Sequence, residues 1–375
     1  MKKWIMAIAA FVILAGAVLF LVPQAHKASV GTSAPAARTS RAEKILKSMT
    51  LEEKVGQMFL VCVSNSTINR EDIASYHLGG YLFFADFFKE RDKETAKAAI
   101  ISYQEAAAVP MLMAADEEGG TVVRVSKFPA YRQSPFASPQ ELYKKGGLDR
   151  IREDTAKKSD LLLSLGINVN LAPVCDMTED KNSFIYSRTL GQDKEKTADY
   201  ISAVIGVMNE KQIGSALKHF PGYGGNADTH TDIVTDDRPY ETFVSEDFLP
   251  FKAGIDAGAP CVLVSHNIVK CMDKDKPASL SKRVHEILRT ELGFSGVIVT
   301  DDLSMDGAAD YSQDENIAVA AVLAGNDLLC TSNYKDQISA VCQAVESGKI
   351  PMEQIDGSAL RVLKWKEALG LLDKQ

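Results

Sequence analysis

The sequence predicts a (β/α)8 barrel of the TIM type, and three observations support this fold. Short apolar runs recur along the chain, at 58–63, 80–84, 110–115, 167–171, 213–217, 261–264, 297–299 and 327–330. Segments with helical character separate them, and polar residues follow most of them. Continuous apolar runs are typical of parallel strands buried on both faces, and eight is the strand number at which such a sheet closes into a barrel.

The helices are predicted from their starts and their apolar spacing. The first spans 41–57, and Thr50 begins a second segment within it because Glu53 stands three residues on, as in a capping box. The stretch 127–147, rich in Pro, Ser and Lys, is expected to form a long excursion on the catalytic rim or a brace against it. Other helices are expected at 93–108, 151–165, 197–211, 282–292, 313–323, 335–347 and 352–371. Since only the last of these follows residue 347, no second folded domain is expected.

The N-terminus has a different character from the rest of the chain. Lys2 and Lys3 precede an apolar run over 4–22, and Ala, Ser, Thr and Pro dominate after it. This layout predicts a signal peptide or membrane anchor at 1–25 and a flexible linker at 26–40, followed by the barrel at 41–375. Both alternatives place the barrel outside the cell, either secreted or anchored to the outer face of the cytoplasmic membrane.

The composition of the chain disfavours nucleic acid as a partner and gives no sign of a zinc site. The 42 basic and 50 acidic residues give a formal charge of −8, so no broad positive field favours nucleic acid. The hydrophobic content of 46% is that of a globular protein, and we expect a monomer. No cysteine has the Cys/His spacing of a zinc site, and no metal or cofactor is predicted. We expect mostly free thiols among Cys62, Cys175, Cys261, Cys271, Cys330 and Cys342.

Polar residues follow the predicted strands, and the densest group follows the fifth. Lys218 and His219 open a Gly-rich stretch that continues to Asp228, His230 and Asp232. Such a loop adds little stability, because Gly costs backbone entropy and clustered charge is costly to bury unpaired. Ligand binding or chemistry is therefore expected there.

The seventh strand ends in Asp301 and Asp302, which either face the ligand crevice or cap the next helix. Other predicted strands end near 116–120, Asp176, 265–267 and 331–333. Polar groups from several strand ends converging on one rim indicate a site for a small polar ligand.

Five motifs in order resemble those of glycoside hydrolase family 3, and specifically its bacterial β-N-acetylhexosaminidases (β-N-acetylglucosaminidases). The resemblance covers about residue 41 to the C-terminus. The motifs are 116–120 with Arg124, 186–191, 218–222, 228–230 and 300–305.

The resemblance implies a retaining mechanism with a covalent glycosyl-enzyme. Asp301 would be the nucleophile. His230 would be the acid/base, with Asp228 accepting from its ring, because a chain that ends shortly after the barrel must find its proton donor within it. The substrate-binding residues implied are Asp116, Arg124, Arg188, Lys218 and His219. Alternatively, Lys218 pairs with Asp116 for structural reasons, and Arg124 forms a surface salt bridge.

Two positions depart from the family pattern. Tyr223 stands where a second His is usual, and Tyr cannot titrate near neutral pH. Glu117 stands where Gln is common, and it adds negative charge near the sugar unless it points away.

The implied function is removal of terminal β-linked N-acetylglucosamine from cell-wall oligosaccharides, as in peptidoglycan turnover, or from chitin-type oligosaccharides. The alternatives are a family-3 β-glucosidase, a glycoside phosphorylase and a catalytically silent sugar-binding protein. A metal-dependent hydrolase is disfavoured, because Cys62-Val63-Ser64 stands where such a barrel would carry His-x-His.

Overall fold

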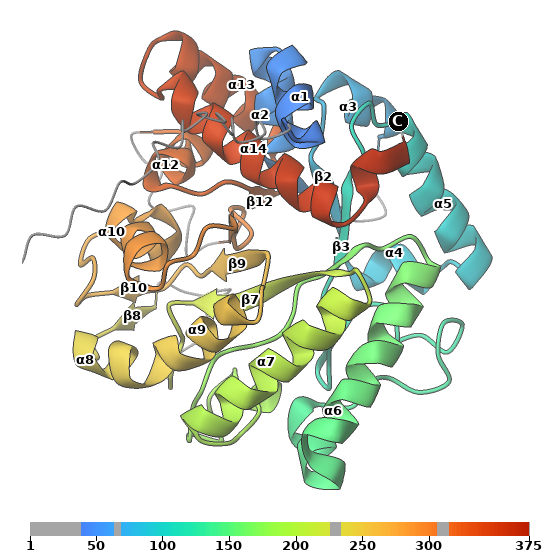
Figure 1. Ribbon diagram of the computed structural model, residues 1–375, viewed down its shortest axis with the longest axis vertical. Helices are drawn as coiled ribbons and strands as arrows, with labels where there is room; N and C mark the ends of the chain where they lie inside the picture. Colours follow the sequence, from blue (N-terminus) through green and yellow to red (C-terminus); the bar gives the residue numbers. More distant parts are fainter. Residues whose placement is uncertain (1–38, 64–68, 226–233, 306–314, 375) are drawn as a thin grey trace, which may run out of the picture. The chain divides into compact units, whose positions relative to one another are not determined.

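The computed structural model describes residues 39–374 apart from 64–68, 226–233 and 306–314 (Figure 1). The expected signal or anchor segment, and nearly all of the expected linker, lie outside this range. No helix among the described residues has the length and apolar character needed to span a bilayer.

Eight parallel strands form a nearly closed barrel in chain order. They are β1 (Phe59–Val63), β2 (Gly80–Phe83), β3 (Leu112–Ala115), β6 (Val169–Asn170), β7 (Gly214–Phe220), β9 (Cys261–Val264), β11 (Val297–Thr300) and β12 (Leu329–Thr331). The last two strands meet through a bridge between Val299 and Leu328, and the Thr300 amide donates to the Leu328 carbonyl at 3.1 Å. Each predicted apolar run overlaps one of these strands, so the predicted TIM-type fold is confirmed.

Helices surround the barrel, and Figure 1 shows α6 and α7 lying side by side. The α-helices are α1 (Arg41–Ser48), α2 (Leu51–Gln57), α3 (Arg70–Ser75), α4 (Ala85–Lys89), α5 (Lys93–Ala106), α6 (Pro139–Ser164), α7 (Lys194–Glu210), α8 (Tyr240–Thr242), α9 (Phe248–Asp256), α10 (Lys282–Glu286), α12 (Ile317–Ala324), α13 (Tyr334–Glu346) and α14 (Met352–Ala368). Short 3-10 or π segments are η1 (Tyr186–Arg188), η2 (Phe243–Asp247), η3 (Ala278–Leu280), η4 (Ile287–Glu291) and η6 (Leu371–Lys374). Two small ladders pair β4 (Glu117–Gly119) with β5 (Val122–Val123), and β8 (Thr235–Asp236) with β10 (Ile268–Val269).

The predicted helix boundaries hold at some places and fail at others. Thr50 caps α2 through the expected capping box with Glu53. The predicted helix at 282–292 divides into α10 and the π segment η4. The stretch 127–147 is not loop throughout, because α6 begins at Pro139; this helix is interrupted where Gly147 adopts a positive φ of 59°. Only glycine takes up that conformation at little cost.

The barrel interior is filled by apolar side chains up to the cavity at its carboxyl end. Leu60, Leu112, Val169 and Ala216 belong to this interior cluster, and Trp365 of α14 joins it. A Cβ on Gly214, at the start of β7, would lie 2.9 Å from the Trp365 indole, so only glycine lets this ring approach. The packed interior makes the barrel a rigid support for groups at the strand ends.

Lys366, next to this indole, is a fully buried cation at the periphery of the core. Its ammonium donates to Oε1 of Gln57 at 2.6 Å, and burial lowers its pKa to about 7. An unfolded lysine has a pKa of about 10.4. Between these values the unfolded chain binds one more proton than the folded chain, so the free energy of unfolding rises with pH.

We predict that Lys366→Met raises the free energy of unfolding by about 1–2 kcal/mol at neutral pH, because it removes the cost of burying a charge. The gain should shrink as pH approaches about 10, because the cost of deprotonating the lysine on folding falls as pH nears its unfolded pKa of about 10.4. Urea unfolding at the two pH values measures it, with Lys364→Met at an exposed neighbouring position as control. A gain that does not change with pH would contradict the assignment.

Candidate active site

A cavity of about 220 Å³ opens at the carboxyl ends of the barrel strands. Its polar lining residues are Asp116, Glu118, Arg124, Arg188, Lys218, His219, Thr300, Asp301 and Asp302. Its apolar walls include Leu82, Phe84, Val122, Leu263 and Met305. The structure thus brings together Asp301 and all five residues predicted to bind the substrate. The other two predicted residues, Asp228 and His230, lie outside the described residues.

Lys218 is the central cation of the cavity. It projects from β7, its side chain is 3% exposed, and its ammonium lies 2.7 Å from Oδ1 of Asp116 and 2.6 Å from Oε1 of Glu118. Burial would lower the pKa of Lys218, but the charges of Asp116 and Glu118 outweigh burial and raise it. The ion pair expected between Lys218 and Asp116 is therefore present. The third N–H of the ammonium has no partner among the described residues, so it can serve a ligand.

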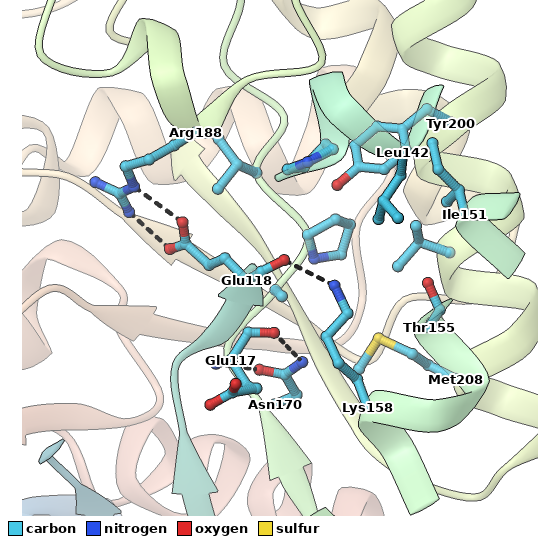
Figure 2. Close-up of a pocket in the computed structure, with 15 residues that line it drawn as sticks. Glu117, Glu118, Leu142, Ile151, Thr155, Lys158, Asn170, Arg188, Tyr200 and Met208 are labelled. Carbon is cyan, nitrogen blue, oxygen red and sulfur yellow. Dashed lines mark hydrogen bonds and ion pairs between the residues drawn. The ribbon is translucent and has the colours of Figure 1, made fainter. Parts of the chain in front are cut away.

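Arg188 and Glu118 form a two-pronged ion pair (Figure 2), and Glu118 also contacts Lys218. Nε of Arg188 donates to Oε2 of Glu118 at 2.9 Å, and Nη2 donates to Oε1 at 2.8 Å. Burial would raise the pKa of Glu118, but Arg188 and Lys218 hold it far below its usual range. In Figure 2 the remaining terminal nitrogen of Arg188 points away from Glu118. Within the described part of the chain that nitrogen has no hydrogen bond, so it too can donate to a ligand.

The hydrogen bonds of His219 fix its tautomer. Its Nε2 lies 3.1 Å from Nη2 of Arg188, and its Nδ1 lies 2.7 Å from Oδ2 of Asp176. A guanidinium can only donate, so Nε2 accepts, and Nδ1–H must donate to the Asp176 carboxylate. His219 is therefore a neutral imidazole that orients Arg188. In this arrangement it has no ring N–H for a sugar, although the resemblance implied that it binds the substrate.

Asp116 and Arg124 form the opposite part of the polar lining. Nη2 of Arg124 lies 3.5 Å from Oδ2 of Asp116, and its guanidinium carbon lies 5.4 Å from the centre of the Phe84 ring. Burial would raise the pKa of Asp116, but Lys218 and Arg124 outweigh it and lower the pKa. Arg124 is thus a lining residue of the cavity, whereas the alternative prediction was a surface salt bridge.

The two aspartates after β11 differ in their surroundings. The Asp301 amide donates to the Val264 carbonyl at 3.0 Å, which continues the strand ladder to the cavity. Oδ1 of Asp302 accepts from the Ser304 amide at 2.9 Å, as in an Asx-turn. The Asp302 carbonyl accepts from Nε2 of His266 at 3.0 Å. Asp302 therefore shapes the turn, and Asp301 is the carboxylate held at the end of the strand.

Two buried carboxylates were given no role by sequence reasoning. Glu118 holds both Arg188 and Lys218, and Asp176 accepts from His219 and from the Tyr223 amide at 2.8 Å. The sequence did carry a signal for Glu118. Two acids stand beside Asp116 at a strand end, and cations are predicted on the same rim. Acids that are buried there need such cations as partners.

The two departures from the family pattern point away from the cavity. Glu117 is fully buried, and its carboxylate accepts from the amides of Arg124 at 2.9 Å and Val125 at 2.8 Å. Burial nevertheless raises the pKa of Glu117. The buried Tyr223 ring lies 5.1 Å from the His219 ring. Glu117 thus anchors the segment that carries Arg124, and Tyr223 packs against His219.

Glu118 and Arg188 also line a second, smaller cavity, where hydrogen bonds fix the backbone next to their ion pair (Figure 2). There Lys158 of α6 donates to the Glu118 carbonyl at 2.8 Å. The Asn170 side chain accepts from the Glu117 amide at 2.9 Å and donates to its carbonyl at 3.1 Å. These bonds fix the backbone of β4. At about 20 Å³, this cavity has room for little more than one water molecule.

A β/α barrel whose strand ends gather carboxylates and cations around one small cavity defines a class of enzymes that act on small polar ligands. The family model described as "Glycosyl hydrolase family 3 N terminal domain" matches residues 50–365. The chain therefore belongs to glycosyl hydrolase family 3 and is a glycoside hydrolase.

Named relatives and solved structures agree with this family. A beta-hexosaminidase of Xanthomonas campestris pv. campestris (strain B100) is 31% identical over 263 residues, which cover 68% of this chain and 77% of that protein. Beta-hexosaminidase LpqI of Mycobacterium tuberculosis (strain ATCC 25618 / H37Rv) is 28% identical over 326 residues, with 84% and 82% covered. The solved structure of M. tuberculosis LpqI has a TM-score of 0.78 at 26% identity and covers 88% of this chain and 97% of that chain.

A family 3 β-N-acetylglucosaminidase from Paenibacillus sp. str. FPU-7 has a TM-score of 0.79 at 29% identity. The match covers 86% of this chain and 63% of that one, so this chain spans less than two thirds of the Paenibacillus protein's length.

We predict that Glu118→Gln lowers kcat/KM at least about tenfold, because Arg188 and Lys218 lose the charge that positions them. Steady-state hydrolysis of an aryl glycoside measures it. Glu153→Gln, at an exposed glutamate of α6, is the control, and its kcat/KM should stay within about threefold. Equal losses in the two variants, both correctly folded by circular dichroism, would remove the positioning role from Glu118.

Proposed function

We propose that this chain is a retaining exo-β-N-acetylhexosaminidase that removes terminal β-linked N-acetylglucosamine from oligosaccharides of the cell-wall or chitin type. The observation that carries the proposal is the cavity itself, in which Asp301 lies on the same lining as Asp116, Arg124, Arg188 and Lys218. The names of the relatives add the N-acetylhexosaminide class.

Asp301 is the proposed nucleophile. In a retaining glycosidase a carboxylate attacks the anomeric carbon, and water then hydrolyses the covalent glycosyl-enzyme. Its position at the carboxyl end of β11 supports this role, because the hydrogen bond from the Asp301 amide to the Val264 carbonyl holds its backbone beside the cavity. Asp302 suits it less, because its carboxylate accepts from the Ser304 amide and lies 3.4 Å from the Cys62 thiol.

His230 is the proposed acid/base and Asp228 its partner. His230 would protonate the glycosidic oxygen in the first step and take a proton from water in the second. An imidazole titrates near neutral pH without the burial that a carboxylic acid would need. Both residues follow β7 in the sequence, the strand that delivers Lys218 to the cavity.

The remaining lining groups would hold the sugar. The unpartnered nitrogen of Arg188 and the third N–H of Lys218 can donate to hydroxyl or acetamido oxygens, and Asp116 can accept from hydroxyls. His219 and Asp176 would act by keeping the Arg188 guanidinium in place.

Water is the proposed acceptor in preference to phosphate. Among the described lining residues, the carboxylates Asp116, Glu118, Asp301 and Asp302 outnumber the cations Arg124, Arg188 and Lys218. An excess of negative charge opposes the entry of a phosphate anion. This argument disfavours a glycoside phosphorylase.

We further propose that the protein works as a monomer outside the cytoplasmic membrane, delivered or tethered by its first 25 residues. The support is the sequence pattern at 1–25, with the linker at 26–40 giving the barrel reach.

We predict that Asp301→Ala lowers kcat by at least about a thousandfold while the fold is retained, because the covalent step is lost. Azide should restore activity in this variant and give the α-glycosyl azide, identified by NMR. Asp237→Ala, at an exposed aspartate, is the control and should keep the wild-type rate. Near-normal activity of Asp301→Ala would exclude it as the nucleophile.

We predict that His230→Ala slows substrates with poor leaving groups by about 10²–10⁴-fold, and activated aryl glycosides much less, because protonation matters most when departure is difficult. Rates on p-nitrophenyl and alkyl N-acetylglucosaminides test this. Losses of equal size on both substrates would remove the acid role from His230.

The substrate class is tested by aryl glycosides that differ only at C2. We expect kcat/KM for the acetamido sugar to exceed that for the hydroxyl sugar by at least about tenfold. The reverse order would favour a β-glucosidase. Binding of N-acetylglucosamine without turnover of any glycoside would favour a silent sugar-binding protein.

A further inference from the structure

Two thiols lie together at the floor of the sugar cavity. Cys62 of β1 and Cys330 of β12 project into the barrel interior, and their sulfur atoms are 3.4 Å apart. Cys330 lines the cavity together with Asp301 and Asp302. The function proposed above gives this pair no role.

The Cys62 thiol also contacts the acid pair. Its sulfur lies 3.4 Å from Oδ2 of Asp302. If the Cys62 S–H donates to this carboxylate, the Cys330 S–H is left to donate to the Cys62 sulfur, which gives a short proton relay. A proton released by either thiol therefore has an acceptor beside it.

Hydrogen bonds of the Cys330 backbone connect it to the residues that flank Asp301 and Asp302. Its amide donates to Oγ1 of Thr300 at 3.0 Å, and its carbonyl accepts from the Leu303 amide at 2.9 Å. Thr300 immediately precedes Asp301, and Leu303 immediately follows Asp302. A shift of Cys330 is therefore passed directly to the segment that holds the two aspartates.

We propose that Cys62 and Cys330 are a redox pair, and that their oxidation to a disulfide reversibly abolishes hydrolysis in the cavity. A peroxide is the oxidant, since hydrogen peroxide is small enough to enter. The Cys330 sulfur attacks one peroxide oxygen, the O–O bond breaks, and a sulfenic acid and one water result. The Cys62 sulfur then attacks the sulfenic sulfur, the S–O bond breaks and a second water leaves. Two electrons pass from the thiols to the peroxide, and their two protons end in the waters.

Closure would change the site because the two sulfurs must approach to about 2.0 Å. The strand register pairs Cys330 with Leu60, so Cys62 lies diagonally across the ladder. Because diagonal positions on neighbouring strands are too far apart for an unstrained disulfide, the ends of β1 and β12 must move to form the S–S bond. The movement displaces Thr300 and Leu303 with Cys330, and it removes the Cys62 thiol from Asp302.

The rate of closure should depend on pH. The hydrogen bond with Cys62 lowers the pKa of the Cys330 thiol, which attacks the peroxide, but burial and the charges of nearby carboxylates such as Asp302 outweigh it and raise the pKa. Because the thiolate is the reactive form, oxidation should be faster at about pH 8.5 than at about pH 6.

The test uses the full chain, first reduced and then treated with hydrogen peroxide. We expect a mass lower by two hydrogens, a peptide linking Cys62 to Cys330, and a loss of hydrolysis of at least about tenfold that dithiothreitol reverses. Cys330→Ala, which removes the thiol that attacks the peroxide, should keep its own untreated rate after peroxide. Cys271→Ser, which removes the exposed thiol, should respond as the wild type does.

Three results would overturn the proposal: all thiols intact after peroxide, a link between other cysteines, or a Cys62–Cys330 disulfide with full activity. Should Cys330→Ala fail to fold, peptide mapping of the wild type still decides whether the bond forms. The mass and mapping need no glycosidase activity, so they fail or succeed independently of the proposed function.

Discussion

The site depends on the compensation of charge buried inside the barrel. A buried lysine keeps its full charge at neutral pH only if acids compensate it, and Lys218, whose side chain is 3% exposed, has Asp116 and Glu118 within 2.7 Å. These pairs tie β7 to the end of β3 and to β4, across the cavity mouth. Because each ion needs its partners, the cations cannot turn towards solvent, and their remaining N–H groups stay directed into the cavity. The need to pair each buried charge makes the cluster costly to form, and it also fixes the positions of its side chains.

Arg188 connects the charged cluster around Lys218 to two further buried groups, His219 and Asp176. A guanidinium bound on one edge by Glu118 and on another by a neutral imidazole has little freedom, and the buried carboxylate of Asp176 fixes that imidazole in one tautomer. Lys158 and Asn170 hold the backbone of the acids from behind. A sugar therefore meets donors whose orientation is set before it binds, which lowers the entropic cost of recognition.

Much of the fold could be read from the sequence, because parallel strands buried on both faces leave continuous apolar runs, and because Thr50 and Glu53 form a local capping box. The π segment at 287–291 could not, since tertiary packing decides it. The start of α6 has a local signal that the prediction missed, because Ser138 accepts from the Glu141 amide as an N-cap and Pro139 follows it. In the site, strand-end logic found Asp116, Lys218 and Asp301. It did not find the partners of Glu118, which lie 70 and 100 residues away, because one sequence carries no record of which distant charges meet. The family resemblance also implied that His219 binds the sugar, whereas the hydrogen bonds of the ring make it an acceptor from Arg188.

The central claim is that the carboxylate at the end of β11 attacks the anomeric carbon of a sugar held by the Lys218 cluster. The most direct measurement is to trap the glycosyl-enzyme with an activated fluorinated N-acetylglucosaminide, digest the protein and locate the sugar by mass spectrometry. We expect one sugar per chain, on Asp301. A label on another carboxylate, or turnover with inversion and no covalent sugar, would contradict this mechanism.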